Sequence, residues 1–290
     1  MAFKLSPIVA GMWRLREWKL DTPGLVRWIE QAIELGITSF DHADIYGDYG
    51  VEPEFGEALA ASPGLRERLQ IVTKCGIKPV STARPAHAIK SYDSSRAHVL
   101  ASVDQSLRAL PTDRIELLLM HRPDLLMDPD ELAATFGELR AAGKVLHFGV
   151  SNHSPSQFAL LHRRLPLVTH QIELSPLRMG ALTDGALDQA VDLQLPPMVW
   201  SPLAGGQLLT AQDEQARRVR PVLETLARDW GGSAATMAYA WVRRHPSRPI
   251  PITGSRRIEA LREAVASLDV RLSAEDWYRV WQASMGREVA

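Results

Sequence analysis

The run ITSFDHADIYGDYG, residues 37–50, contains the features on which the prediction of the fold rests. Its apolar start, Ile37 to Phe40, is typical of a buried strand and ends at an acid, Asp41, and Tyr46 follows in a loop punctuated by glycine. Two later apolar runs end in the same way, because QIVTKCG (70–76) carries Lys74 and IELLLMHRPD (115–124) carries His121. If these strands are parallel neighbours, their carboxyl ends meet at one pocket. We therefore predict that four polar side chains converge there.

The rest of the chain repeats this arrangement of a strand followed by a helix. The predicted strands are Pro7 to Met12, Ile37 to Asp41, Gln70 to Lys74, Ile115 to Met120, His147 to Ser151, Val168 to Glu173, Met198 to Ser201 and Ile250 to Thr253. Alternating strands and helices imply parallel pairing. Eight such units fit a (β/α)8 TIM barrel, with surrounding helices, better than an open sheet. We expect one domain over residues 1–290.

The helices are predicted from apolar periodicity and from residues that suit helix ends. A helix is expected from Thr22, with Thr22 as N-cap, Pro23 in the first turn and Gly36 at the far end. The other predicted helices are Pro53 to Ala61, Ser95 to Leu110, Pro129 to Ala142, Ser154 to Leu165, Gly185 to Leu193, Pro221 to Trp230, Ser233 to Arg243, a helix ending near Leu268, and Ser273 to Met285. The polar loop from Lys78 to Asp93 is expected to be a lid or a simple surface loop.

Composition limits the classes of function. The chain has 290 residues, 46% hydrophobic and 23% charged, with 33 basic and 34 acidic residues and a net charge of -1. This balance predicts a soluble globular protein without a nucleic-acid partner. The single cysteine, Cys75, allows no disulfide within the chain and no cysteine metal cluster. With no signal-peptide layout and no apolar run long enough to span a bilayer, we expect a cytoplasmic protein without a membrane partner, as a monomer or weak oligomer.

The residue types at the predicted pocket suit delivery of a proton to a carbonyl oxygen. Hydride arriving at a carbonyl carbon leaves charge on the oxygen, so an acid or a fixed dipole is needed there. Tyr46 can act as the acid if the ammonium of Lys74 favours the phenolate, and Asp41 can keep Lys74 charged and aimed. His121 can donate a second hydrogen bond to the carbonyl. Each residue alone has an ordinary structural explanation, but the four together favour a catalytic site.

These motifs resemble the aldo-keto reductase family over nearly the whole chain. The matching stretches are DHADIYG (41–47), TKCG (73–76), LLMHRPD (118–124), GVSN (149–152), WSPLAGG (200–206) and TGSRR (253–257). Their order and their positions at strand ends make the resemblance specific, and the wording is most similar to a bacterial YdhF-like branch. The resemblance implies an NADPH-dependent reductase that converts an aldehyde or ketone, a small-molecule carbonyl substrate, to an alcohol.

The resemblance also implies roles for individual residues. Tyr46 would be the proton donor, Lys74 its activator, Asp41 the partner of Lys74, and His121 the residue that orients the carbonyl. The implied cofactor contacts are Gly11 and Met12; Ser151, Asn152 and Gln171 at the carboxamide; Trp200 on the nicotinamide ring; Ser201, Leu203 and Gly205 at the pyrophosphate; and Gly254, Ser255 and Arg256 near the 2′-phosphate. Ala264 stands where many members have Asn, so a preference for NADPH rests on Ser255 and Arg256.

Two other hypotheses stay open. A non-catalytic or slow NADPH-binding redox sensor would keep the same cofactor residues, and the family contains such proteins. A metal-dependent barrel hydrolase could use His42, Asp44 and His121 as ligands. Against it, Asp41 and His42 are adjacent and point to opposite sides of the strand, and no His-x-His pair occurs. We therefore expect no bound metal.

Overall fold

The structure is a computed structural model and describes residues 3–290. The barrel strands in chain order are β1 (Val9–Gly11), β2 (Ser39–Asp41), β3 (Gln70–Cys75), β6 (Ile115–Met120), β7 (Val145–Ser151), β8 (His170–Glu173), β9 (Met198–Trp200) and β10 (Ile250–Thr253). They form a closed barrel in the order β1-β10-β9-β8-β7-β6-β3-β2. The predicted (β/α)8 class is therefore confirmed. The chain divides into two compact units, Met1–His170 and Gln171–Ala290, which are described in turn; the single domain stays a prediction.

In the first unit, five parallel strands bring their carboxyl ends to one edge. The residue pairs that fix the register are Gly11 with Asp41, Asp41 with Val72, Lys74 with Leu119, and Met120 with Val150. Every residue of β6 is buried, as expected of a parallel strand covered on both faces. The apolar runs in the sequence therefore end at a common level, and the polar residues that follow them lie at the same edge.

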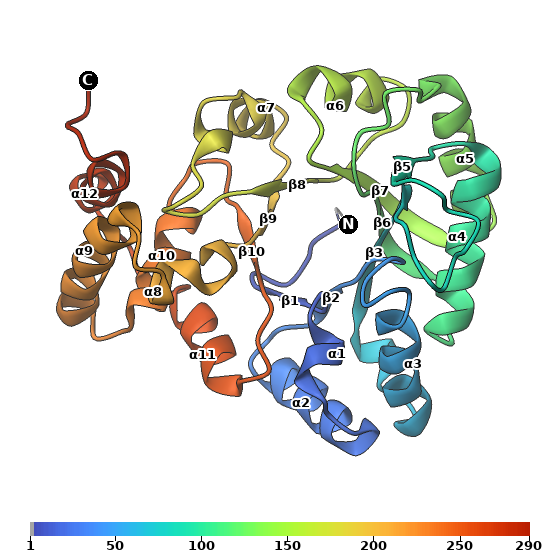
Figure 1. Cartoon of the computed structure of the whole chain (residues 1–290), viewed down its shortest axis with the longest axis horizontal. Coiled ribbons are helices and arrows are strands. Elements are labelled where there is room, and N and C mark those ends of the chain that lie inside the picture. The colour runs from blue at the N-terminus through green and yellow to red at the C-terminus, as the bar shows by residue number, and fades with distance from the viewer. Residues whose placement is uncertain (1–2) are drawn as a thin grey trace. The chain divides into compact units, whose positions relative to one another are not determined.

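Helices cover the outside of these strands. They are α1 (Leu15–Trp18), α2 (Thr22–Glu34), α3 (Val51–Ala61), α4 (Arg96–Ala109), α5 (Pro129–Ala141) and α6 (Pro155–His162). In Figure 1, α3, α4 and α5 lie outside β3, β6 and β7. The prediction of Thr22 as N-cap is wrong by one residue, because the side chain of Asp21 accepts from the Gly24 N–H at 2.8 Å. Thr22 is the first residue inside the helix.

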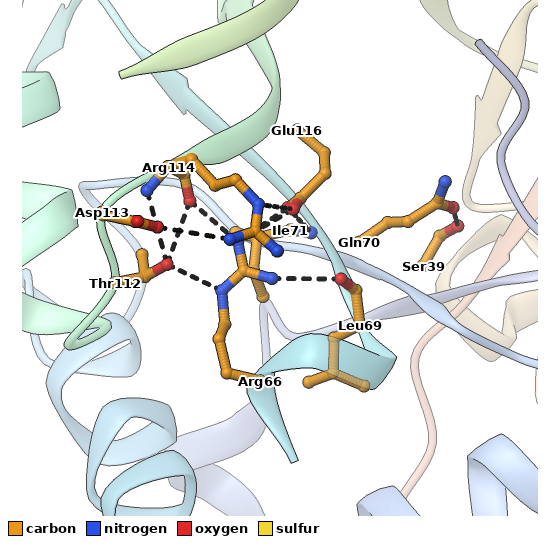
Figure 2. A network of polar contacts seen from close by, with 9 residues as sticks. All are labelled: Ser39, Arg66, Leu69, Gln70, Ile71, Thr112, Asp113, Arg114 and Glu116. Carbon is orange, nitrogen blue, oxygen red and sulfur yellow. Dashed lines mark hydrogen bonds and ion pairs between the residues drawn. The ribbon is translucent and has the colours of Figure 1, made fainter. Parts of the chain in front are cut away.

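The amino ends of β3 and β6 are joined by a buried ion pair (Figure 2). The Arg66 guanidinium donates to both carboxylate oxygens of Glu116 at 3.0 and 2.9 Å, and Glu116 also accepts from the Ile71 N–H at 2.7 Å. Arg66 donates further to the backbone oxygens of Leu69 and Arg114. Because both charges are hydrogen-bonded on several sides, their burial is compensated. This network holds together the two strands whose opposite ends carry Lys74 and His121.

The second unit contains β8, β9 and β10, paired in parallel through Glu173 with Trp200 and Pro251 with Val199. Its helices are α7 (Ala186–Asp192), α8 (Gln207–Thr210), α9 (Glu214–Trp230), α10 (Ala234–Arg243), α11 (Ile258–Ala266) and α12 (Ala274–Met285). The prediction that a helix begins at Pro221 is wrong, because α9 begins seven residues earlier, with Asp213 as its N-cap and Pro221 in its interior. The buried stripe that includes Val219 and Leu223 packs α9 onto the unit despite this proline.

The last helix is fastened to α10 by two tryptophans. The indole N–H of Trp241 donates to the backbone oxygen of Trp277 at 3.0 Å, and the indole of Trp277 donates to the backbone oxygen of Trp241 at 3.1 Å. The rings stack with centroids 5.0 Å apart and 5° between planes. Each indole N–H is therefore satisfied by the other residue. No helix in residues 3–290 combines the length and apolar character needed to cross a bilayer.

Candidate active site

Lys74 is the centre of a buried polar group at the carboxyl edge of the first unit. Its ammonium donates to the Asp41 carboxylate at 2.7 Å, to the backbone oxygen of His42 at 2.7 Å and to the Tyr46 hydroxyl at 3.0 Å. The Lys74 side chain is completely buried and that of Asp41 is almost so. Three acceptors for three N–H bonds satisfy the ammonium fully, which is the condition for burying such a charge.

The strand register explains how these groups meet. The ladder between β2 and β3 continues beyond Asp41, because the His42 N–H donates to the Val72 oxygen at 2.7 Å and the Asp44 N–H to the Lys74 oxygen at 3.0 Å. Side chains alternate along a strand, so Asp41 and His42 point to opposite faces. Asp41 points to Lys74, whereas the His42 ring packs on Phe55 of α3 with centroids 4.5 Å apart.

Charge and burial compete at Lys74 and Tyr46. Burial pulls the pKa of Lys74 down, but the Asp41 charge and the Tyr46 interaction outweigh it and leave the pKa above its ordinary value. Burial raises the pKa of Tyr46 above its ordinary value, while the Lys74 charge pulls it down and the Asp41 charge raises it. Lys74 lowers the pKa of Tyr46 as predicted, but burial is the larger effect and the pKa is raised. Lys74 therefore keeps its charge and Tyr46 keeps its proton at neutral pH.

His121 lies immediately after β6 and beside Tyr46. The two rings meet edge to face, with centroids 5.7 Å apart and 77° between planes. Burial, and then the charges of Lys74, Arg122 and Lys90, hold the pKa of His121 well below its ordinary value, so the imidazole is neutral. Its Nδ1 is buried without a hydrogen-bond partner in residues 3–290. A neutral imidazole beside the phenol can donate one hydrogen bond without adding charge.

The loop that follows Tyr46 adopts an unusual backbone. Gly47, Asp48 and Tyr49 are all left-handed, with φ of 58°, 57° and 64°. The strain at the two non-glycine positions is offset by contacts: the Asp48 carboxylate accepts from the hydroxyls of Ser81 and Thr82. The Arg16 guanidinium donates to the Gly47 oxygen at 2.9 Å. The loop is therefore tied to the segment after β3, and it holds Tyr46 in place.

The segment predicted as a lid or surface loop begins and ends in a short antiparallel pair. Its strands are β4 (Ile77–Lys78) and β5 (Ser91–Tyr92). Lys78 and Asp93 form a half-exposed ion pair at 3.3 Å across this base.

Four of the predicted cofactor residues belong to the first unit. Gly11 ends β1 in register with Asp41, and the Met12 N–H donates to the Asp41 backbone oxygen at 2.9 Å. Ser151 ends β7 and is buried, and the Asn152 amide donates to its hydroxyl at 2.7 Å. Asn152 has a left-handed φ of 57°. All four stand at the same strand edge as Lys74, and their contact with a cofactor stays a prediction.

The other predicted cofactor residues belong to the second unit, and all except Gln171 stand at or after the carboxyl ends of its strands. Gln171 lies in β8 and is buried, with its amide nitrogen 3.8 Å from the Met198 sulfur. Trp200 ends β9, half-buried. Ser201, Leu203 and Gly205 follow it in a sharply bent loop, where the φ angles of Ser201 and Gly205 are 52° and 67°.

The region after β10 has features that suit an anion. Gly254, Ser255 and Arg256 connect β10 to α11, and the arginine is exposed. The N-cap residue of α11, Arg257, makes no side-chain capping hydrogen bond. An N-terminus without a side-chain cap, next to arginines, fits a phosphate group.

In the loop after β9, Gly206 has φ of 97° and open space where a side chain would be, so backbone can approach a ligand closely.

The candidate ligands of a metal-dependent hydrolase do not form a metal site. No group of three or more ligating side chains occurs in the part of the chain that the structure describes. Both nitrogens of His42 lie buried against α3, without partners among residues 3–290. The arrangement of these side chains therefore does not support the hypothesis of a metal-dependent hydrolase.

One polar cluster was not predicted from the sequence. Asp44 and Glu52 are buried between β3 and the helices α3 and α4, where they accept hydrogen bonds from Ser102 and Ser106 respectively. The only sequence signal for it is that Ser102 and Ser106 lie four residues apart, on one face of a helix.

Comparison with known proteins identifies the class to which this fold and site belong. The model of the aldo/keto reductase family matches residues 7–284, and the chain belongs to that family. It is 47% identical over 289 residues to oxidoreductase YdhF of Escherichia coli strain K12, covering 99% of this chain and 96% of YdhF. It is 39% identical over 290 residues to 6-dehydroglucose reductase of Agrobacterium fabrum strain C58, covering 99% and 97%.

A solved structure agrees with this family assignment. Glycerol dehydrogenase from Gluconobacter oxydans superposes with a TM-score of 0.85 at 25% identity, covering 98% of this chain and 92% of that one. The protein is therefore an oxidoreductase with the barrel of the aldo/keto reductases.

Proposed function

We propose that the protein reduces an aldehyde or ketone to an alcohol with NADPH, and that Tyr46 supplies the proton. The observation that carries the proposal is the ammonium of Lys74, which is hydrogen-bonded to both Asp41 and the Tyr46 hydroxyl inside the protein. A cation held at this position stabilises the phenolate that proton transfer would leave behind. The pKa of Tyr46 is raised by burial, so the phenol is protonated and ready to donate.

His121 complements Tyr46 in this proposal. Its neutral ring stands edge to face with the phenol, so a carbonyl oxygen that accepts from Tyr46 can accept a second hydrogen bond from the imidazole. Two donors fix the orientation of the carbonyl and hold the charge that develops on its oxygen. A charged imidazole would compete with Tyr46 for the role of acid, and its low pKa avoids this.

The cofactor would supply the hydride, and the chain would supply binding and orientation. In the first unit, Ser151 and Asn152 offer polar side chains that suit a carboxamide. In the second unit, Trp200 offers a ring face, and Arg256 beside the N-terminus of α11 suits a 2′-phosphate. Among these features only Arg256 favours NADPH over NADH, because NADH has no 2′-phosphate.

The substrate is proposed only as a class. One relative is named 6-dehydroglucose reductase, which suggests polyhydroxylated aldehydes as the first compounds to examine. The segments that would surround a substrate are the loop after Tyr46, the segment from Lys78 to Asp93 and the loop after His121.

Two measurements on the purified protein test the proposal. Tryptophan fluorescence is titrated with NADPH and with NADH, in the parent and in Trp200→Phe. Oxidation of NADPH is then followed with a panel of aldehydes and ketones that includes 6-dehydroglucose. We expect tighter binding of NADPH than NADH, less quenching in Trp200→Phe, and turnover of at least one aldehyde. Binding without turnover of any carbonyl would favour the redox sensor, and no binding of either nucleotide would contradict both.

A further inference from the structure

A second set of buried polar groups lies on the opposite face of β3 from Tyr46. Successive residues of a strand point to opposite faces, so Lys74 points to Asp41 whereas its neighbour Thr73 points to α3. On this outer face stand the carboxyls of Asp44 and Glu52, which are 5% and 2% exposed. Both are therefore separated from Lys74 by the backbone of one strand.

The two carboxyls are held very differently. Both oxygens of Glu52 accept hydrogen bonds, from the hydroxyl of Thr73 at 2.5 Å and from that of Ser106 at 2.8 Å. Asp44 accepts from one hydroxyl, that of Ser102 at 2.7 Å, and the Ile45 N–H also lowers its pKa. Its other oxygen is buried without a partner in residues 3–290. Asp44 is thus the carboxyl whose ionised form is less stabilised by its surroundings.

Asp44 is also connected directly to Lys74. Its backbone N–H donates to the Lys74 oxygen at 3.0 Å, which fixes the side chain at a constant place relative to β3. The titratable groups that act on Asp44 or feel its charge are Glu52 of α3, Lys74 and Cys75 of β3, and Tyr49 of the loop after Tyr46, while α4 presents the hydroxyl of Ser102.

We propose that Asp44 is a positioning residue behind Lys74: the charge of its buried carboxyl, on the opposite face of β3, sets how far Lys74 stabilises the Tyr46 phenolate. The inference rests on the proposed role of Tyr46 as acid. An ionised Asp44 adds a negative charge behind Lys74, and its repulsion of the phenolate offsets part of the stabilisation that the ammonium supplies. Reduction is therefore faster while Asp44 is neutral.

The titration itself has a physical cause in the same geometry. Burial raises the pKa of Asp44 to about 7; the Ser102 hydrogen bond acts against this rise, and the Glu52 charge adds to it. Removal of the Ser102 hydroxyl would destabilise the ionised form and move the transition to higher pH. Removal of the Ser106 hydroxyl, one helical turn away, would affect Glu52 instead.

The test uses the Tyr46 ring as a reporter that needs no turnover. The protein is labelled with ¹³C at the ζ carbon of its five tyrosines, and the Tyr46 resonance is assigned with Tyr46→Phe. We expect its chemical shift to move with a midpoint near pH 7 in the parent. The midpoint should vanish in Asp44→Asn, which keeps the shape of the side chain, and rise in Ser102→Ala. It should not rise in Ser106→Ala, because a less ionised Glu52 repels the Asp44 carboxylate less. The proposal would be overturned if the pH dependence of the Tyr46 chemical shift were unchanged in Asp44→Asn. Equal effects of the two serine variants on the midpoint would also overturn it.

Rates of carbonyl reduction provide the second readout. Between pH 6 and 8.5 the single-turnover rate of the parent should fall roughly three- to tenfold more than that of Asp44→Asn. If Tyr46 titrates as described but no carbonyl is reduced, the proposed function fails and the coupling of Asp44 to Tyr46 stands. If carbonyls are reduced and the parent and Asp44→Asn have the same pH profile, this inference fails and the proposed function stands.

Discussion

The ammonium nitrogen of Lys74 lies 3.0 Å from the hydroxyl oxygen of Tyr46, and no part of the Lys74 side chain is exposed. The ammonium also lies 4.8 Å from the centre of the Tyr46 ring. Water cannot screen a charge in this position, so its influence on the phenol is larger than at a surface site. The loop from Gly47 to Tyr49 and the ladder between β2 and β3 keep the two groups at this separation.

Replacement of Tyr46 by Phe should remove the proton donor and leave the fold intact. We expect the rate of carbonyl reduction to fall by about 100-fold or more, because general acid catalysis contributes at least that much. NADPH affinity should be unchanged, since no cofactor residue is altered. Stopped-flow rates and fluorescence titration measure the two quantities. Tyr49→Phe is the matched control and should keep full activity; a Tyr46→Phe variant as fast as the parent would exclude Tyr46 as the acid.

Replacement of Arg256 by Ala should weaken NADPH binding selectively. Loss of a charged hydrogen bond to a phosphate weakens binding by roughly tenfold to a hundredfold. NADH has no 2′-phosphate, so its affinity should not change. The control is Arg262→Ala, because Arg262 lies on α11, the helix that follows Arg256, and pairs with Glu259 at 3.7 Å. Fluorescence titrations measure the affinity of each variant for both nucleotides. An equal loss for NADPH and NADH would remove Arg256 from the phosphate site.

The elements that could be predicted from the sequence are those with a local signal. The run Ile115 to Met120 is apolar at nearly every position and ends at His121, so both the strand and the polar residue at its end were readable. The helix Leu15–Trp18 has four residues, which is too short to show a period. Pro221 predicts a helix start because proline is common there, whereas the cap at Asp213 and the apolar stripe place it inside a longer helix.

The cluster behind β3 could not be predicted because its hydrogen bonds join distant parts of the chain. Asp44 and Ser102 are 58 residues apart, and Glu52 and Ser106 are 54 apart. Their pairing depends on how α3 and α4 pack on β3, which periodicity does not specify. The sign of the pKa shift at Tyr46 has the same origin, since the depth of burial is a property of the packed structure.

Replacement of Glu116 by Ala should destabilise the first unit strongly. The change leaves the Arg66 guanidinium, 8% exposed, without its carboxylate and leaves the Ile71 N–H without its acceptor. Breaking a buried pair on one side costs about 3–5 kcal/mol. Glu138→Ala, which breaks an exposed pair with Arg96, should cost less than about 1 kcal/mol. Urea unfolding of both variants measures the difference in stability. Equal losses of unfolding free energy would show that the buried Arg66 pair stabilises the protein no more than the exposed pair does.

His42 should make the protein sensitive to acid. Burial, and then the Lys74 charge, lower the pKa of His42 from 6.5 to about 3. Between pH 6.5 and about pH 3, His42 binds a proton in the unfolded chain but not in the native protein. The free energy of unfolding therefore falls as the pH drops below 6.5. The variant His42→Leu has no such proton. Relative to the parent, it should gain about 2 kcal/mol on going from pH 7.5 to pH 5, at roughly 1.4 kcal/mol per pH unit below 6.5.

Unfolding of the His42→Leu variant by urea at the two pH values gives this difference directly. Phe55→Leu is the matched control, because it disturbs the same ring contact and carries no proton. Its loss of stability should be the same at both pH values. If His42→Leu also shifts stability equally at pH 7.5 and pH 5, the imidazole takes up a proton in the folded protein above pH 5. The ring would then have a partner for its N–H groups, in contrast to the two unpartnered nitrogens seen between β2 and α3.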